Sequence, residues 1–163
     1  MAGKTKEEDG RKTIVRNRRA RFDYELLDTL EAGIALRGPE VKSLRAGLAN
    51  LADAYAAVRG GSIFLHHLHI PPYPQAGREN PEPRRDRRLL LHRREILRLA
   101  GELGDPGTTL VPLSLYWKDG RCKVELGLVR GRKRGDKREA IRRREEQREV
   151  QRAVRKVRRG SAE

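Results

Sequence analysis

Residues 113–128 read LSLYWKDGRCKVELGL and form the clearest β-hairpin pattern in the chain. Apolar residues alternate with Ser, Tyr, Lys, Glu and Gly on both sides of a central Lys-Asp-Gly-Arg segment, as in half-buried strands. The pair Asp119-Gly120 is typical of a type I′ turn, because both central residues of that turn need a positive φ. The segment therefore predicts two antiparallel strands joined by a tight turn.

Three further strands are expected upstream of this hairpin. Residues 22–36 are apolar enough for one long strand, in which Gly33 suits a bulge or bend. Residues 54–58 and 62–70 flank a Gly-Gly pair that suits a two-residue turn. At least five short strands within some 110 residues favour a mainly β fold. We expect an OB-fold-like closed antiparallel barrel, because closure leaves no open strand edges.

Two short helices and one long loop are expected beside these strands. Pro39 suits the first position of a helix that Gly47 would end. Apolar residues with a helical period between Leu90 and Gly101 predict the second helix. The loop, residues 71–88, reads PPYPQAGRENPEPRRDRR, and loops of this length inside compact domains are often functional.

The net charge of +15 is concentrated at the two ends of the chain. Residues 1–21 hold eight Lys or Arg against three acids, and residues 132–159 hold fourteen against five. A nearly neutral core with basic extensions is typical of a protein that grips a polyanion. We expect three parts: a disordered N-terminal extension over 1–13, a barrel over 14–131, and a basic C-terminal tail over 132–163.

Cysteine content and hydropathy predict a cytoplasmic protein. Cys122 is the only cysteine, so an internal disulfide and a multi-cysteine zinc site are both excluded. No apolar run approaches the roughly 20 residues that span a bilayer, so no membrane association is expected. The charged N-terminus is unlike a secretory signal peptide.

The sequence offers little for catalysis. If residues 62–70 form one strand, His67 and His69 share a face at a spacing that metal sites use, but no third ligand is evident. The acids nearly all lie beside Arg or Lys, which is typical of surface ion pairs. We expect no enzyme activity, no metal and no cofactor; a metal-dependent nuclease that uses this histidine strand is the alternative from another class.

Arginine clusters indicate nucleic-acid binding. NRRAR at 17–21 and RRDRR at 84–88 add two clusters to the basic tail, and Arg suits phosphate contacts. Single-strand binders stack bases on aromatic rings, yet the chain has only four Tyr, two Phe and one Trp. Recognition of a folded RNA through shape and phosphates fits better.

The tail has a narrow apolar stripe. Val150, Ala153, Val154 and Val157 follow the i, i+3, i+4, i+7 spacing of one helix face. The stripe is too small to dock firmly, and the surrounding cations repel one another. We therefore expect the tail to be disordered in the free protein and helical on RNA.

Seven stretches occur in order between residues 14 and 138: NRRAR at 17–21, EAGIAL at 31–36, GPEVKSLRAGLANL at 38–51, PRRDRRLLLH at 83–92, LVPLSLYW at 110–117, KVELGL at 123–128 and RGRKRGDKR at 130–138. Together they resemble the SsrA-binding protein (SmpB) family, the bacterial partners of transfer-messenger RNA. The number of matching stretches makes the resemblance specific.

The resemblance implies an OB-type barrel that binds the tRNA-like domain of transfer-messenger RNA. It further implies that the complex enters stalled ribosomes in trans-translation, so that the nascent chain is tagged for degradation. The tail would lie as a helix in the vacant mRNA channel, and the protein, expected to be a monomer, would perform no chemistry. A ribosomal or initiation-type OB protein, which would not need transfer-messenger RNA, is the alternative within the binding class.

The matching motifs also imply which residues bind RNA. Arginine and lysine can meet phosphates, whereas Glu31 could accept a hydrogen bond from a base amino group or a 2′-OH. Leu90 is open between an RNA contact and a core residue. The implied RNA-binding residues are Asn17, Arg18, Arg19, Arg21, Glu31, Lys42, Arg45, Leu90, His92 and Lys123.

In the tail, the resemblance implies contacts with the ribosome. The implied residues are the basic pair Arg132 and Lys133, together with Gly135, Asp136, Lys137 and Arg138. The family usually has an aromatic ring where this chain has Gly135, and glycine cannot stack on a nucleotide. Either a neighbour such as Arg134 stacks instead, or this contact is dispensable.

Overall fold

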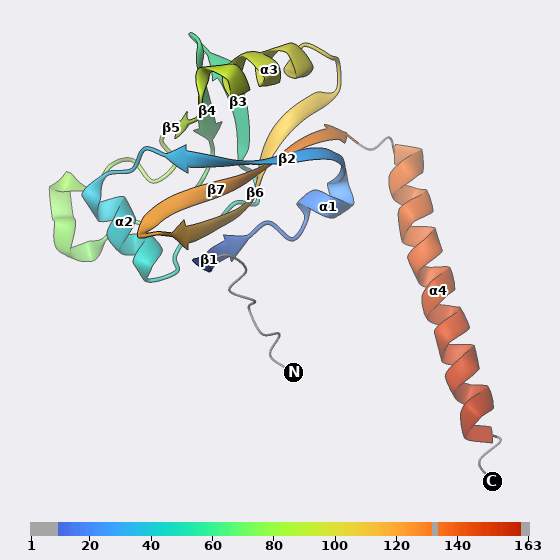
Figure 1. Cartoon of the computed structure of the whole chain (residues 1–163). Coiled ribbons are helices and arrows are strands. Elements are labelled where there is room, and N and C mark those ends of the chain that lie inside the picture. Colours follow the sequence, from blue (N-terminus) through green and yellow to red (C-terminus); the bar gives the residue numbers. More distant parts are fainter. Residues whose placement is uncertain (1–9, 132–133, 161–163) are drawn as a thin grey trace. The chain divides into compact units, whose positions relative to one another are not determined.

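The computed structural model describes residues 10–131 and 134–160, which divide into two compact units at Gly131/Arg132. The first unit carries the strands and the short helices, and the second carries one long helix (Figure 1). The elements are β1 (Arg11–Arg16), α1 (Ala20–Asp23), β2 (Tyr24–Ile34), α2 (Gly38–Arg45), β3 (Tyr55–Arg59), β4 (Ser62–His66), the 3₁₀ segment η2 (Pro74–Glu79), β5 (Arg87–Leu90), α3 (Arg93–Leu103), β6 (Thr108–Lys118), β7 (Arg121–Gly131) and α4 (Arg134–Gly160).

The described residues contain one antiparallel sheet of seven strands, in the order β1-β6-β3-β4-β5-β2-β7. A further pairing between β6 and β7 joins six of these strands into a closed ring of hydrogen-bonded neighbours, and β1 pairs with β6 alone. The expected mainly β, antiparallel fold is therefore confirmed. The ring explains how many short strands leave few open edges.

The hairpin at the centre of the sequence pattern is confirmed. Strands β6 and β7 pair from Thr108↔Arg130 to Lys118↔Arg121. Asp119 and Gly120 have φ values of 51° and 74°, as a type I′ turn requires. A register shift between Pro112 and Ser114 changes which side chains face inward.

Because of this shift, the expected uniform alternation is wrong at Leu113. Leu115 lies in the main core, whereas Leu113 packs against a small second cluster beneath α1. That second cluster consists of Ala20, Val111 and Val129, with Tyr24 beside them. A β-bulge adds one residue to a strand and so moves the following side chains to the opposite face.

Strand β2 pairs with two neighbours and thereby helps to close the ring. Most of it pairs with β7, and its end, Gly33 and Ile34, also pairs with β5. The register shift of β2 lies between Leu26 and Asp28, so the bulge alternative for Gly33 is wrong. Gly33 serves a close approach, because an added Cβ would lie 3.1 Å from the Cβ of Leu90.

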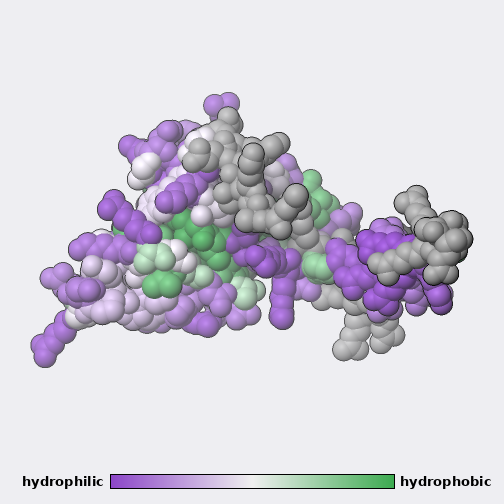
Figure 2. Space-filling model, turned by 90° about the horizontal axis from the view of Figure 1, so that it is seen from below, coloured by the Kyte–Doolittle hydropathy of each residue, from purple (hydrophilic) through white to green (hydrophobic). Residues whose placement is uncertain are grey.

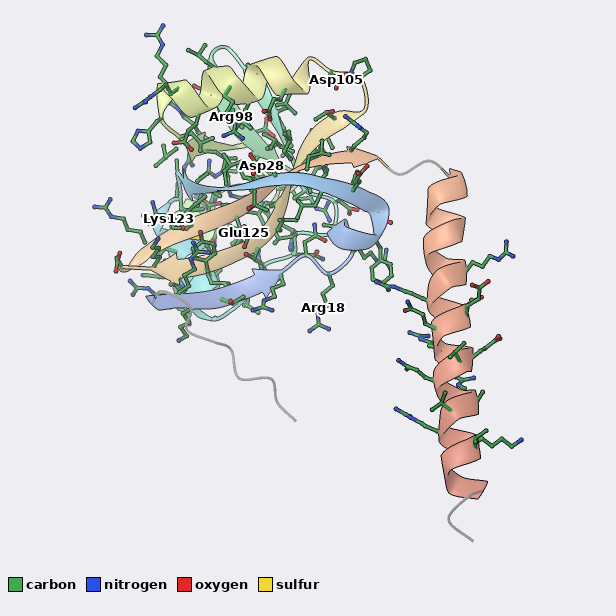
Figure 3. All side chains as sticks on the ribbon, turned by 45° about the vertical axis from the view of Figure 1, so that its right-hand side comes forward. Arg18, Asp28, Arg98, Asp105, Lys123 and Glu125 are labelled. Atoms are coloured by element: carbon green, nitrogen blue, oxygen red, sulfur yellow. The ribbon has the colours of Figure 1, made fainter. Side chains whose placement is uncertain are left out.

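Aliphatic side chains fill the interior of the first unit. They come from alternate positions of the ring strands, as the period of two requires, and from the helices α2 and α3. The fully or almost fully buried members include Leu44, Ile63, Leu65, Leu89, Leu99, Leu110, Leu115, Val124 and Leu126. Helix α3 is also tied to β2 by an ion pair between Arg98 and Asp28 (Figure 3).

Several expected boundaries differ from the structure. Residues 11–13, expected to be disordered, belong to β1, and residues 1–9 lie outside the described part of the chain. Strand β4 ends at His66 instead of continuing to residue 70, since His67 has a left-handed φ of 63°. Strand β5 was not expected: its residues were expected to belong to the end of the long loop and the start of the second helix. Helix α3 ends at Leu103 and not near Gly101.

The second unit is the helix α4, shown in red in Figure 1. Val150, Val154 and Val157 keep 62%, 46% and 72% of their surface exposed.

The face shown in Figure 2 is mostly hydrophilic, and its hydrophobic residues gather mainly in one limited area of the first unit. No helix among the described residues is long and apolar enough to cross a membrane.

Candidate nucleic-acid interface

Four of the expected RNA-binding residues line one pocket. Glu31 comes from β2, Leu90 from β5, His92 from the residue before α3, and Lys123 from β7. The pocket has a volume of about 680 Å³ and is also lined by Arg121 and other residues near the β6–β7 turn. Positions far apart in the sequence thus form a single concave surface with both charged and apolar walls.

Glu31 is the centre of a polar cluster at this surface. Its Oε2 accepts hydrogen bonds from the Tyr116 hydroxyl and from Arg11 Nη2 at 3.2 Å, and Lys118 Nζ lies 3.5 Å away. The Tyr116 hydrogen bond, with Lys118 and Arg11, outweighs partial burial and holds the pKa of Glu31 below its usual value. The carboxylate is therefore ionised at neutral pH and fixed in orientation.

Leu90 is a surface residue, not a core residue. Along β5, Arg87 and Leu89 point inward, and Arg88 and Leu90 point outward. Leu90 keeps 55% of its surface exposed. The core interpretation of this residue is therefore wrong, and its contact with RNA stays a prediction.

His92 and Lys123 line the same pocket as Leu90 and Glu31. His92 is exposed at the N-cap position of α3. Lys123 lies on β7, paired with Tyr116 of β6 and with Gly33 of β2 (Figure 3). Lys123 therefore lies in the same part of the sheet as the Glu31 cluster, because its strand partner Tyr116 donates to Glu31.

The NRRAR segment divides into a structural residue and exposed cations. Asn17 donates from Nδ2 to the Pro112 carbonyl at 3.1 Å and from its backbone N–H to the Leu113 carbonyl at 2.7 Å, which fastens the segment to β6. Arg18 and Arg19 are exposed, and Arg18 points away from the strands (Figure 3). Arg21 belongs to α1.

Lys42 and Arg45 lie exposed in the last turn of α2. The Lys42 ammonium sits 5.2 Å from the ring centroid of Tyr73, a cation–π distance. Cations at the C-terminal end of a helix are favoured by the helix dipole. Tyr73 therefore helps to hold the Lys42 charge in place, and both charges remain accessible to solvent.

The RRDRR cluster is partly structural, contrary to the expected role in phosphate binding. Arg87 is fully buried, and its Nε donates to Glu40 Oε2 at 2.5 Å. Its other nitrogens donate to the carbonyls of Leu68 and Pro83 at 2.6 Å and 2.9 Å. Arg85 Nε also donates to Glu40 Oε1 at 3.1 Å. These two arginines hold the loop to α2, and the fully buried Arg87 is not available to RNA.

Glu40 is almost fully buried in this network. Burial raises its pKa, but hydrogen bonds from Arg85, from the Arg37 N–H and from Arg87 outweigh burial and hold the pKa below its usual value. Burial lowers the pKa of Arg87, against the opposing effect of Glu40. A buried ion pair with all its polar atoms engaged fixes geometry strongly.

Sequence reasoning missed the partners of Glu31. Arg11 lies in the segment that was expected to be disordered, and Tyr116 was treated only as part of a strand. Tyr116 and Lys118 are two residues apart on the hairpin, so strand alternation predicts that they share a face. Nothing in the sequence pairs that face with Glu31, because the contact spans 85 residues.

The histidine-strand interpretation rested on a wrong strand boundary. His67 lies beyond the end of β4, and His69 forms an isolated bridge with Asn50. The two residues therefore do not share one strand face. Within residues 10–131 and 134–160, no group of three or more His, Cys, Asp or Glu could hold a metal ion.

The expected tail residues lie at the start of the second unit. Gly135, Asp136, Lys137 and Arg138 belong to the first turns of α4. Arg132 and Lys133 lie outside the described residues. Their roles stay predictions.

Comparison with known proteins identifies the family. A model of the SmpB protein family matches residues 14–156. The SsrA-binding protein of Frankia casuarinae is 57% identical over 126 residues, which cover 77% of this chain and 79% of that protein. The SsrA-binding protein of Desulforamulus reducens is 54% identical over 134 residues, which cover 82% of this chain and 83% of that protein.

A solved structure is similar as well. One chain of a solved structure described as "tmRNA-SmpB: a journey to the center of the bacterial ribosome" superposes on this chain with a TM-score of 0.65 and 50% sequence identity. The match covers 79% of this chain and 94% of that chain. The matches in sequence and in structure thus each extend over most of both proteins. The chain therefore belongs to the SmpB family.

Proposed function

We propose that this chain binds the tRNA-like domain of transfer-messenger RNA through the surface that surrounds Glu31, Leu90, His92 and Lys123. The family acts with transfer-messenger RNA on the ribosome in trans-translation. Its members are RNA-binding proteins, not enzymes, and they act in the cytoplasm. The observation that carries the proposal is the single pocket into which four separate elements bring these residues.

The chemistry of this surface suits a folded RNA. Lys42, Arg45 and Lys123 offer positive charge to phosphates, and Arg18 and Arg19 extend the charge beyond the pocket. Glu31 supplies a fixed hydrogen-bond acceptor for an amino group or a 2′-OH. Its own charge is offset by Arg11 and Lys118, so it repels nearby phosphates less than an isolated carboxylate would.

An OB-like barrel is the arrangement that we propose for the first unit. The closed ring of six paired strands and the aliphatic interior support it. The short helices would then flank the barrel, with α3 next to the RNA-binding pocket, where His92, Glu95 and Ile96 form part of the wall.

The tail, residues 132–163, is proposed to act on the ribosome. In the free protein it would be disordered, and in the mRNA channel it would be a helix. The long helix α4 and its exposed valines support this assignment, because an isolated helix without a buried face gains little from tertiary packing. Arg132, Lys133 and residues 135–138 would contact ribosomal RNA.

Titration with the isolated tRNA-like domain tests the proposal. The wild-type chain should bind this RNA tightly, and Lys123→Ala should weaken binding by about ten-fold. The control Lys12→Ala removes an exposed lysine that does not line the pocket. Equal binding of an unrelated RNA of the same length would instead favour a general ribosomal or OB-type RNA binder and would contradict the proposal.

A further inference from the structure

The outward face of the β3–β4 hairpin carries a group of stacked rings that the proposed interface does not use. Tyr55 of β3 lies opposite His66 of β4. Its ring centroid is 5.0 Å from that of His66 and 5.5 Å from that of His67, with interplanar angles of 28° and 29°. We name Tyr55, His66 and His67 the ring platform.

The ring platform is open to solvent at Tyr55 and His67, whereas His66 keeps only 15% of its side chain exposed. Tyr55 keeps 41% of its surface exposed, and His67 is exposed as well. The left-handed backbone of His67, with a φ of 63°, turns the chain just after β4. Without this turn a regular strand would place His67 on the face opposite His66, so the local conformation is what brings a third ring to Tyr55.

Positive charge lies next to the platform on the same sheet face. The Arg59 guanidinium covers the Phe64 ring at 4.1 Å from its centroid. Arg59 and His66 both contact Asp86, at 3.2 Å and 2.8 Å. The carboxylate is thereby occupied by two partners, which also hold Arg59 and His66 in position.

The platform is continuous with the candidate RNA interface. Phe64 lies two residues from His66 on β4 and pairs directly with Arg88 of β5. Arg88 is exposed and lines the same pocket as Leu90. A path of outward-facing side chains therefore leads from the pocket over Arg88 and Phe64 to the rings.

We infer that the ring platform is a stacking site for an unpaired nucleotide of the RNA that occupies the neighbouring pocket. The inference rests on the proposed function and extends its surface by one base-recognition site. Exposed rings offer a π-face to any base, and Arg59 and Arg88 supply cations for the adjoining phosphates. Beside the platform two cations, Arg59 and Arg88, outnumber the one carboxylate, Asp86, which is already engaged by Arg59 and His66. This excess of positive charge suits a polyanion better than a neutral or basic protein segment.

Affinity measurements on the tRNA-like domain test the site with four chains: wild type, Tyr55→Ala, Tyr55→Phe and Leu27→Ala. Loss of the ring in Tyr55→Ala should weaken binding about five-fold or more, whereas Tyr55→Phe keeps the ring and should bind nearly as wild type does. Leu27→Ala is the matched control, because Leu27 is 42% exposed against 41% for Tyr55 and does not line the pocket.

A second measurement uses the unaltered full chain and avoids any question of folding. NMR signals of the Tyr55 ring should shift in a saturable way when hexauridylate or hexaadenylate, both unstructured, is added. Equal affinities of Tyr55→Ala and Leu27→Ala, or the absence of saturable ring shifts with both oligonucleotides, would overturn the inference.

The outcomes separate this inference from the proposed function. If Lys123→Ala weakens binding and Tyr55→Ala does not, the ring platform is wrong and the pocket stands. If the wild-type chain does not bind the tRNA-like domain, the proposed function itself fails. Ring shifts with a ribosomal protein but with neither oligonucleotide would assign the face to a protein partner and would also overturn the inference.

Discussion

Glu31 is an anion at a surface that we propose binds RNA, and its neighbours explain how it could serve there. Tyr116, Arg11 and Lys118 meet on one carboxylate oxygen, Oε2. Arg11 also covers the Tyr116 ring at 4.7 Å from its centroid. The carboxylate is thus oriented by a buried hydroxyl and neutralised by two cations, which converts a repulsive charge into a directed acceptor.

Tyr116→Phe should weaken binding of the tRNA-like domain about three- to ten-fold, the usual range for loss of one hydrogen bond. Tyr116 makes the largest contribution to the lowered pKa of Glu31, so this pKa should rise in the variant. Binding should therefore fall off at higher pH than in the wild type as the solution is acidified. Because the pKa of Glu31 lies below its ordinary value, affinity measured from pH 7 down to about pH 3 checks this.

Tyr24→Phe is the control for this experiment, since it removes a hydroxyl from a tyrosine in the second apolar cluster. It should leave the pH profile of binding unchanged. If Tyr116→Phe binds more weakly but with the wild-type pH profile, Tyr116 stabilises the sheet without positioning Glu31.

At the scale of elements, the β6–β7 turn depends on a backbone conformation and not on a contact. Gly120 has a φ of 74°, and a Cβ there would meet nothing within 4 Å. Gly120→Ala should therefore lower the free energy of unfolding by about 1–2 kcal/mol through backbone strain alone. Urea unfolding measures this cost.

Gly131→Ala provides the matched control, because Gly131 also has open space around it but no positive φ. It should be neutral within about 0.5 kcal/mol. A similar cost for both substitutions would show that the turn is not the source of the effect.

The ion pair between α2 and β5 should make stability depend on pH. Glu40→Gln should lower the free energy of unfolding on the order of 3 kcal/mol at neutral pH, because it leaves Arg87 buried without a charged partner. The folded-state pKa of Glu40 lies below its ordinary value. Its contribution is therefore fully present above the ordinary pKa and is lost as the pH falls through the folded-state pKa.

Urea unfolding of wild type and Glu40→Gln at several pH values tests this dependence. The difference between them should be greatest near pH 7 and should shrink as the pH falls below about 4.5. Glu25→Gln, at an exposed glutamate, should show no such difference. A gap that stayed constant down to pH 3 would mean that Glu40 contributes through packing alone.

The elements differ in how far their own sequence determines them. The β6–β7 hairpin and the β3–β4 hairpin could be predicted because their turns and their alternation are local signals. Strand β5 could not, since its four residues, Arg87–Leu90, follow a Pro- and Arg-rich loop and precede a helical pattern. The buried role of Arg87 depends on Glu40, 47 residues away, and composition alone predicts an exposed arginine.

The candidate site shows the same limit. The resemblance to a family implied that Glu31, Leu90, His92 and Lys123 all bind RNA. In the structure these four residues line one pocket. Arg11, Tyr116 and Lys118 were missed because they act through Glu31 across three strands. Residues that position another residue leave no local signal in a sequence.

At the scale of the whole molecule, the two units are expected to divide the work between two RNAs. Removal of residues 132–163 deletes the second unit but keeps β7, which ends at Gly131. The shortened chain should bind the tRNA-like domain nearly as tightly as the full chain. It should fail to support tagging on stalled ribosomes, measured in a reconstituted translation reaction.

Replacement of α4 by a flexible Gly/Ser segment of equal length is the control, since it preserves chain length without the helix or its charge. It should fail in tagging as the deletion does. A severe loss of affinity for the tRNA-like domain on deletion would contradict the division of labour.

Salt dependence tests the same division by counting charges. Eight cations are expected at the first RNA, six in the proposed interface and two beside the ring platform: Arg18, Arg19, Arg21, Lys42, Arg45, Lys123, Arg59 and Arg88. Each phosphate neutralised contributes roughly 0.7 to 0.9 to the slope of log affinity against log salt, so a slope of about −6 to −7 is expected for the tRNA-like domain. The chain without residues 132–163 should give the same slope, although it lacks fourteen Lys and Arg. A distinctly steeper slope for the full chain would show that tail cations also contact the first RNA, and the tail could then not be reserved for the ribosome.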